Sequence, residues 1–353
     1  MERDPIRFLV DELEQRLDTV RAFVAPRLGA PAEGLAFVPN PTFAVNSVLA
    51  SIALSPGDEI VFTSHGYNAC NNAVRRRAEQ SGAVPVCVEL PFPVASASAV
   101  TERLVSAFTE RTRLLLVDHV TSPTGLVLPI EDIVREAHAR GIDVLIDGAH
   151  APGMLPLSIE RLGVAWYTGA FHKWLCAPKG ASFLYTREDK RGATRPIVTS
   201  HGANTTRTDR SRYLVEFDWT GTHDPTALLS VPAAIEAVEA LHPDGIAGVM
   251  RDNRELALRG RDLLAERLER EPPCPDDMVG SLAALSLPAG PADPLRLALR
   301  RRHRIQVPVF AFRQAPERLV RVSAQRYNAL DDYEHLARAL ELELAAELEL
   351  ALR

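Results

Sequence analysis

Short apolar runs and amphipathic stretches alternate along the chain from residue 35 to residue 190. Each apolar run is rich in β-branched residues and has the length of a buried strand. Polar turns and stretches with apolar residues at helical spacing separate the runs. This alternation predicts an α/β fold with a mostly parallel sheet. The predicted strands lie at residues 35–38, 59–63, 83–88, 113–119 and 142–146, with helices at 44–53 and 129–140 among those between them.

The last part of the chain shows a different pattern. A proline-rich break, EPPCPDD, comes before residue 280. Beyond it, strand and helix signals mix without regular alternation, which predicts a small α+β unit. We expect strands at 282–287, 305–310 and 319–322, a helix at 294–302 and a C-terminal helix.

The N-terminal residues 6–28 place apolar side chains at helical spacing and predict an amphipathic helix. A chain of 353 residues is long enough for two domains. We therefore predict a large domain over residues 1–240 and a small C-terminal domain over residues 241–353. The helical segment 1–28 belongs to the large domain in this scheme and could pack on the small one.

Composition excludes several classes of function. The chain is 46% hydrophobic and carries a net charge of −6, without the basic block of a nucleic-acid-binding protein. Its charged N-terminus, MERDPIRFLVDELEQRL, is unlike a signal peptide, and no apolar run reaches the roughly 18 residues of a membrane span. Four scattered cysteines lack metal-binding spacing. We expect a cytoplasmic protein with reduced thiols, no metal, and no nucleic-acid or membrane partner.

The run IDVLIDGAHAPGMLPL carries the first chemical signal. Its apolar part reads as a buried parallel strand that ends in Asp147. Ligands of open α/β sheets bind at the carboxyl ends of the strands. Asp147 is therefore a candidate site residue.

The lysine content supplies the second signal. Only three of the 40 Lys and Arg residues are lysine, namely Lys173, Lys179 and Lys190. A chain that uses arginine for almost every positive charge, yet keeps Lys173 in an apolar context, indicates a role that a guanidinium cannot fill. A buried amine can lose its proton and attack a carbonyl, whereas arginine stays charged. We interpret the other two lysines as surface residues.

A strand-end carboxylate and a reactive lysine together point to pyridoxal phosphate, which needs a Schiff-base lysine and an anion beside its ring nitrogen. The motifs DGAHAPG and HKWLCAPKG resemble class V aminotransferases of fold type I, in particular the isopenicillin-N-epimerase-like branch. The resemblance covers nearly the whole chain. It implies a large domain with a seven-stranded, mostly parallel sheet, a small α+β domain, bound pyridoxal phosphate and a homodimer.

The resemblance also implies roles for the residues around the cofactor ring. Lys173 is the catalytic lysine, and Asp147 pairs with the pyridine nitrogen. Tyr67 stacks on the ring, with His65 as the second choice. His150 stands where relatives place a residue against the phenolic oxygen.

Further residues match positions that bind phosphate or substrate in the family. Thr42 lies in a strand–turn–helix geometry that favours phosphate, although it could also be an ordinary helix cap. His172 resembles a phosphate-contacting histidine. Thr222, in WTGTHDP, falls where the neighbouring subunit supplies a phosphate contact. Arg321, in RVSAQRYN, matches the arginine that binds the substrate carboxylate.

The sequence departs from the family pattern at several positions. Ala170 stands where relatives have Ser or Asn, and Ser122 where they often have Asn. Ser200 and His201 match a loop near the substrate entrance, without a role that spacing can define. Relatives usually carry a further segment before the first helix that lines the mouth of the site. We expect one of three arrangements: a more open mouth, another element in place of that segment, or a chain start that lies upstream.

The predicted function is catalysis at Cα or Cβ of a small amino-acid substrate through a carbanion, as in an epimerase or a C–S β-lyase. An aminotransferase is the alternative, and a non-catalytic cofactor-binding or scaffold protein is a second one. Cysteine desulfuration is disfavoured because it needs a cysteine shortly before the carboxylate-binding arginine, and none lies between Pro275 and Arg321. A nicotinamide-binding protein is disfavoured because no GxGxxG follows the first strand.

Overall fold

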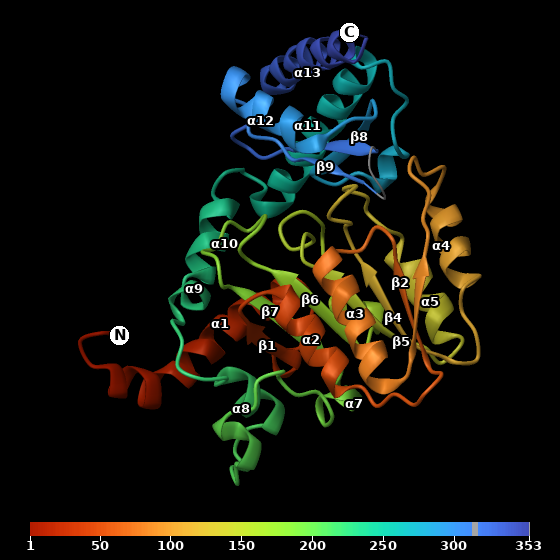
Figure 1. The fold of residues 1–353 in the computed structure, drawn as a ribbon. Coiled ribbons are helices and arrows are strands. Elements are labelled where there is room, and N and C mark those ends of the chain that lie inside the picture. The colour runs from red at the N-terminus through yellow and green to blue at the C-terminus, as the bar shows by residue number, and fades with distance from the viewer. Residues whose placement is uncertain (313–316, 353) are drawn as a thin grey trace.

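The computed structural model describes residues 1–312 and 317–352. Within these residues, seven strands form one sheet in the order β1-β7-β6-β5-β4-β2-β3 (Figure 1). Every neighbouring pair is parallel except the two pairs made by β7, which runs against β1 and β6. The strands are β1 Leu35–Val38, β2 Glu59–Thr63, β3 Val84–Val88, β4 Thr112–Asp118, β5 Asp143–Gly148, β6 Trp166–Ala170 and β7 Ser182–Thr186.

Helices cover both faces of this sheet, which explains why its strands are continuous apolar runs. On one face Ile60 and Phe62 of β2 pack in a cluster with residues of α2 (Pro41–Ser51), α3 (Asn68–Ser81) and α8 (Arg212–Asp218). On the other face Val61 joins a larger cluster. That cluster takes residues from α1 (Leu13–Leu28), α4 (Ala97–Val105), α5 (Ile130–His138), α6 (Ile159–Leu162), α9 (Thr226–Leu229) and α10 (Val231–Glu239).

The second sheet has three antiparallel strands in the described residues, in the order β8-β10-β9. It shares a separate apolar cluster with three helices, and Figure 1 shows this unit above the large sheet. Its elements are β8 Leu282–Leu287, β9 Val309–Ala311, β10 Arg318–Ser323, α11 Gly245–Arg267, α12 Ala292–His303 and α13 Leu330–Ala351. The predicted fold class, a mostly parallel sheet followed by a small α+β unit, is confirmed. The domain boundary predicted at residue 240 falls between α10 and α11 and stays a prediction.

Two predicted elements begin three or more residues away from the predicted start. The helix expected at 44–53 begins at Pro41, because Asn40 caps it by accepting the backbone N–H of Phe43 at 2.8 Å. The strand expected at 305–310 is β9, which begins only at Val309. The residue before it is Pro308, which has no N–H to donate to a neighbouring strand.

The N-terminal helix begins as a π-helical segment, η1 (Arg7–Glu12), and continues as α1, which packs against α9 and α10. Figure 1 shows η1 projecting from the body of the molecule. The remaining short helices are η2 (Ala32–Gly34), α7 (Glu188–Arg191), η3 (His201–Asn204) and η4 (Asp276–Met278). Among the described residues, no helix combines the length and the apolar character that crossing a bilayer requires.

A buried ion pair joins α1 to the end of α8. The Arg21 guanidinium donates to Asp218 Oδ1 at 2.6 Å and to the carbonyl of Leu35 at 2.7 Å. Only 3% of the Arg21 side chain and 7% of the Asp218 side chain are exposed.

We expect Asp218→Ala to lower the free energy of unfolding in urea by about 3–5 kcal/mol, because it leaves a buried guanidinium short of its partner. The control is Asp209→Ala, which removes an ion-pair partner that is 66% exposed. We expect Asp209→Ala to lower the free energy of unfolding by no more than about 1 kcal/mol. Equal decreases in the two variants would contradict the importance of the buried pair.

Candidate active site

The predicted site residues collect at the edge of the large sheet where its parallel strands end. Asp118 ends β4, Asp147 lies near the end of β5, and the two are register partners. The connection between β6 and β7 carries Lys173, and the connection after β2 carries Tyr67. Segments far apart in sequence meet here because neighbouring parallel strands end at the same edge.

Two contacts define the protonation of Lys173. The indole Nε1–H of Trp174 donates to Nδ1 of His150 at 3.3 Å, and Nε2 of His150 lies 3.1 Å from Nζ of Lys173. An indole nitrogen only donates, so Nδ1 of His150 is an acceptor and the neutral ring carries its proton on Nε2. Nε2–H then donates to Nζ. Lys173 can accept this bond only as a neutral amine.

Burial favours the same protonation states. It lowers the pKa of His150 well below its usual range, and the charge of Arg321 lowers it further. Burial also lowers the pKa of Lys173, against the carboxylates of Asp147 and Asp118, which raise it. The neutral amine is the basic and nucleophilic form of lysine. Lys173 therefore has the environment of a reactive amine.

Asp147 keeps a carboxylate oxygen that is only weakly engaged. Its Oδ1 accepts the backbone N–H of Ala149 at 3.0 Å, and its Oδ2 accepts the thiol of Cys70 at 3.3 Å. Burial raises the pKa of Asp147, while these two bonds lower it. A thiol is a weak donor, so Oδ2 can accept a stronger bond from a ring N–H.

The sequence analysis missed Asp118, Cys70 and Trp174. Asp118 is buried, and burial and the Asp147 charge raise its pKa, while interactions with the backbone N–H groups of Tyr67 and Ser122 lower it. It follows an apolar run just as Asp147 does, so the strand-end argument would have found it. Nothing in the spacing signals the thiol of Cys70 or the indole N–H of Trp174, because their roles depend on side-chain directions.

Tyr67 and His65 differ in what their rings can contact. The Tyr67 side chain precedes α3, is 47% exposed and borders a cleft. His65 is fully buried, with edge-on ring contacts to Phe92 and Phe312 and a hydrogen bond to Thr124 at 3.1 Å. A flat ligand needs an accessible ring face, which favours Tyr67 over His65 as the stacking residue.

Thr42 and His172 are the two residues of this chain that the sequence analysis assigned to the phosphate near α2 and Lys173. Thr42 is the second residue of α2, and Asn40 is the cap, so the alternative that Thr42 caps the helix is wrong. Nδ1 of His172 donates to the carbonyl of Ala181 at 2.9 Å, so Nε2 of the neutral ring can only accept a hydrogen bond. Burial lowers the pKa of His172, and a phosphate contact through Nε2 requires the protonated ring. Ala170 pairs across the β6–β7 register with Ser182, whose hydroxyl lies 3.4 Å from the His172 ring.

Arg321 reaches from β10 to the large sheet. Its guanidinium donates to the backbone carbonyl of Ser122 and to the Ser122 hydroxyl at 3.4 Å. Burial lowers its pKa, and its Nε has no hydrogen-bond partner within the described residues. Donor capacity therefore remains for a ligand. Ser122, whose role the sequence left open, lies against this arginine.

Two predicted regions lie apart from this group. Thr222 is on the exposed connection between α8 and α9, where His223 bonds to the carbonyl of Gly221 at 2.8 Å. His201 is exposed in η3. The single chain does not bring Thr222 or His201 to the other predicted residues.

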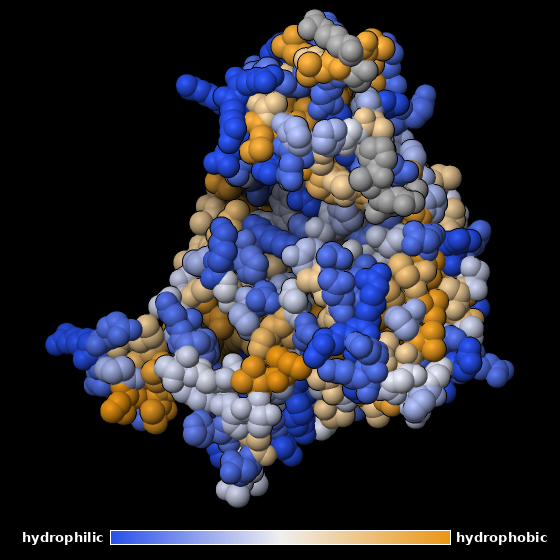
Figure 2. Space-filling view, viewed as in Figure 1, coloured by the Kyte–Doolittle hydropathy of each residue, from blue (hydrophilic) through white to orange (hydrophobic). Residues whose placement is uncertain are grey.

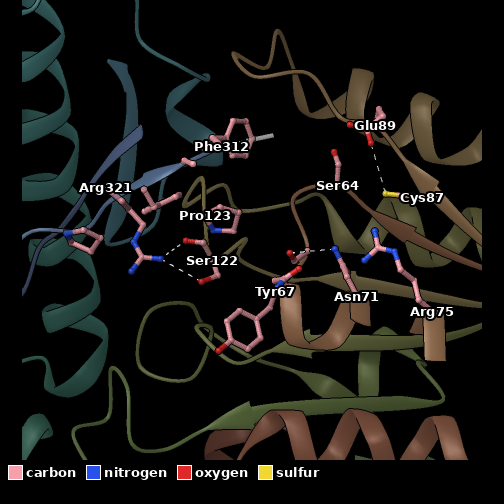
Figure 3. A pocket seen from close by; sticks show the side chains of 15 residues that line it. Ser64, Tyr67, Asn71, Arg75, Cys87, Glu89, Ser122, Pro123, Phe312 and Arg321 are labelled. Carbon is pink, nitrogen blue, oxygen red and sulfur yellow. Dashed lines mark hydrogen bonds between the residues drawn. The ribbon is translucent and has the colours of Figure 1, made fainter. Parts of the chain in front are cut away.

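A cleft of about 850 Å³ opens between the two sheets (Figure 3). Tyr67 and Ser122 line it from the large sheet, and Pro308, Phe310 and Arg321 line it from the small unit. Figure 2 shows the surface hollowed and mostly hydrophilic between these two parts. Asp147 is buried, and neither Asp147 nor Lys173 lines the cleft.

Pyridoxal phosphate fits these groups. It requires an amine for its aldehyde carbon, a carboxylate beside its ring nitrogen, an aromatic face and a phosphate site. The structure offers the neutral amine of Lys173, the weakly engaged carboxylate of Asp147 and the accessible ring of Tyr67. The start of α2, where Thr42 lies, is the kind of helix end that binds phosphate.

Comparison with known proteins identifies relatives over almost the whole chain. Isopenicillin N epimerase of Amycolatopsis lactamdurans is 37% identical, covering 96% of this chain and 88% of that protein. A probable chloroplastic L-cysteine desulfhydrase of Arabidopsis thaliana is 30% identical, over 96% and 76%. Among solved structures, the cysteine desulfurase CsdA from Escherichia coli has a TM-score of 0.77 at 23% identity, over 95% of this chain and 85% of that one. Cysteine desulfurases are also among the curated relatives, at 28% identity over 95% of this chain, so the family leaves that activity open.

The model of the family described as aminotransferase class-V matches residues 7–336. This match and the two curated relatives confirm the predicted family, its epimerase-like branch and the predicted cofactor. The chain belongs to the class V aminotransferases, a family of pyridoxal-phosphate-dependent enzymes with fold type I.

Proposed function

We propose that the protein removes the Cα proton of an amino-acid substrate and eliminates a sulfur group from Cβ. One observation carries the proposal. The Trp174–His150–Lys173 chain makes Lys173 a neutral amine at the edge of the sheet, which is the form that can accept a proton from carbon.

Bound pyridoxal phosphate would take up the electron pair that Cα keeps when its proton leaves. Asp147 is positioned to keep the ring nitrogen protonated, and Tyr67 to hold the ring flat. The residues that we propose bind the cofactor are Thr42, Tyr67, Asp147, His150, His172, Lys173 and, from a second subunit, Thr222. Thr222 is exposed and lies outside the chain's own cleft. This position supports a role for Thr222 in the site of a second subunit, and therefore a homodimer.

Arg321 would hold the substrate carboxylate. A guanidinium can bind a carboxylate through two parallel hydrogen bonds, and its Nε has no partner in the described part of the chain. Lys173 removes the proton from Cα and, as an ammonium, returns it to the sulfur. The Cα–H and Cβ–S bonds break, a Cα–Cβ double bond forms, and no oxidant is needed.

Epimerisation is the second candidate, and the 37% identity to an isopenicillin N epimerase favours it. It begins with the same proton removal but needs a proton on the opposite face of Cα. Desulfuration through a cysteine persulfide is disfavoured. Cys87 lines the cleft, but burial and the Glu89 carboxylate raise its pKa, so it stays a thiol and a poor nucleophile.

The reaction type can be tested with L-cysteine and its S-methyl thioether in deuterium oxide. We expect pyruvate, ammonia and the free thiol in equal amounts, because elimination leaves an enamine that water hydrolyses. Inverted, deuterated substrate without pyruvate would show epimerisation instead, and an intact 2-oxo acid would show transamination. Lys173→Ala is expected to lower the rate at least about a thousandfold, because the base is lost.

A second prediction concerns the lysine that binds the cofactor. Reduction of the holoprotein with borohydride should fix one pyridoxyl group per chain, on Lys173. Lys173→Ala should carry none after gel filtration, whereas Lys179→Ala, with another of the three lysines replaced, should be labelled as the wild type is. Label on another lysine would refute the assignment. Label on Lys173 without turnover of any amino acid would support a non-catalytic binding protein.

A third prediction tests the role of Trp174. In Trp174→Phe, His150 can move its proton to Nδ1, and Nε2 can then accept a bond from a charged Lys173, which raises the lysine pKa. We expect the rate of cofactor uptake by the apoprotein to reach its midpoint about 0.5–1 pH unit higher, the equivalent of one hydrogen bond. The control is Trp166→Phe, since Trp166 Nε1 donates to Thr194 at 2.9 Å, outside the site. Equal midpoints in both variants would contradict the proposed proton placement.

A further inference from the structure

The cleft extends well beyond the groups that the proposed reaction uses. Arg321 and Ser122 lie at one end, and Arg75, Cys87 and Glu89 lie at the other, with Tyr67 between them (Figure 3). Its volume of about 850 Å³ is near the upper end of the roughly 300–1,000 Å³ range typical of sites for drug-sized ligands. A substrate as small as cysteine would leave the far end empty.

The charged groups of the cleft have no partners of opposite charge. Among residues 1–312 and 317–352, neither Arg321, Arg75 nor Glu89 takes part in an ion pair, although many other charged residues of this chain do. Two guanidinium groups and one carboxylate therefore line the same cleft without an oppositely charged partner in the described residues.

Local contacts hold the far-end groups without neutralising them. The guanidinium of Arg75 lies 5.1 Å from the ring centroid of Phe62 and donates to Asn72 at 3.4 Å. Glu89 has the neutral thiol of Cys87 at 3.9 Å. Neither contact uses up the capacity of a guanidinium or a carboxylate to bind an oppositely charged group.

We propose that the substrate is an elongated amino acid with a second amino-acid head group at its far end, joined to the reacting end through sulfur. Arg321 binds the carboxylate at the reacting end, Arg75 binds the distal carboxylate, and Glu89 binds the distal ammonium. The inference rests on the proposed function and adds the substrate class. The elimination releases the distal half as a thiol that still carries its own head group.

The test compares two thioethers with the same Cβ–S bond. S-methyl-L-cysteine ends in a methyl group, whereas L-cystathionine ends in a second amino-acid head group. Each is titrated into the holoprotein, and the change in cofactor absorption gives the half-saturating concentration, whatever reaction follows. We expect L-cystathionine to half-saturate at about a tenfold lower concentration, as expected for added charge-assisted hydrogen bonds at a partly exposed site.

Arg75→Gln and Glu89→Gln should each reduce the difference in half-saturating concentration between the two thioethers to about two- to threefold. The half-saturating concentration of S-methyl-L-cysteine should not change. The matched control is Arg76→Gln, because Arg76 is the next residue of α3, is exposed and does not line the cleft. Equal half-saturation in the wild type, or an advantage that survives in both cleft variants, would overturn the inference and leave the proposed function standing. No absorption change with either ligand would overturn both.

Discussion

The buried charges at the end of the large sheet are the constraint on which the site depends. Asp118 and Asp147 are register partners on neighbouring strands, and both are buried, so each raises the cost of ionising the other. Backbone N–H groups and a thiol offset part of that cost. A cationic ring nitrogen placed against Asp147 would offset more of it. Two buried carboxylates are costly to ionise without a cation beside them. The pair therefore favours the binding of a ligand with a cationic ring nitrogen.

One long side chain of the small unit bonds to the large sheet at this site. Arg321 crosses from β10 to the loop after β4 and bonds to the backbone carbonyl of Ser122. The backbone N–H of Ser122 interacts with Asp118, and so does that of Tyr67. Arg321 and Tyr67, the residues proposed to bind the substrate carboxylate and to stack on the cofactor ring, are thus both connected to one buried carboxylate. A change at Asp118 would disturb both ends of the site at once.

The sequence predicted the features that depend on chain pattern. Apolar runs predicted five of the seven strands of the large sheet, β1 to β5, within two residues, and the strand-end argument led to Asp147. No bounds were predicted for β6 and β7. The sequence could not give the protonation of Lys173, because that depends on which ring nitrogen of His150 faces the indole of Trp174. It also misplaced the starts of α2 and β9, where a single cap residue and a single proline decide the boundary. Features that depend on the direction of one side chain need coordinates.

The fate of the substrate follows from where the protein places its acid–base groups. Lys173 is the group that the structure prepares to accept a proton, and it can return that proton only from the same side of the substrate. If a good leaving group stands at Cβ, its loss competes with any return of the proton to Cα. The choice of reaction then depends on which substrate the cleft admits. Arg75 and Glu89, which lie far from the reacting carbon, would in that case influence the chemistry by selecting the group that leaves.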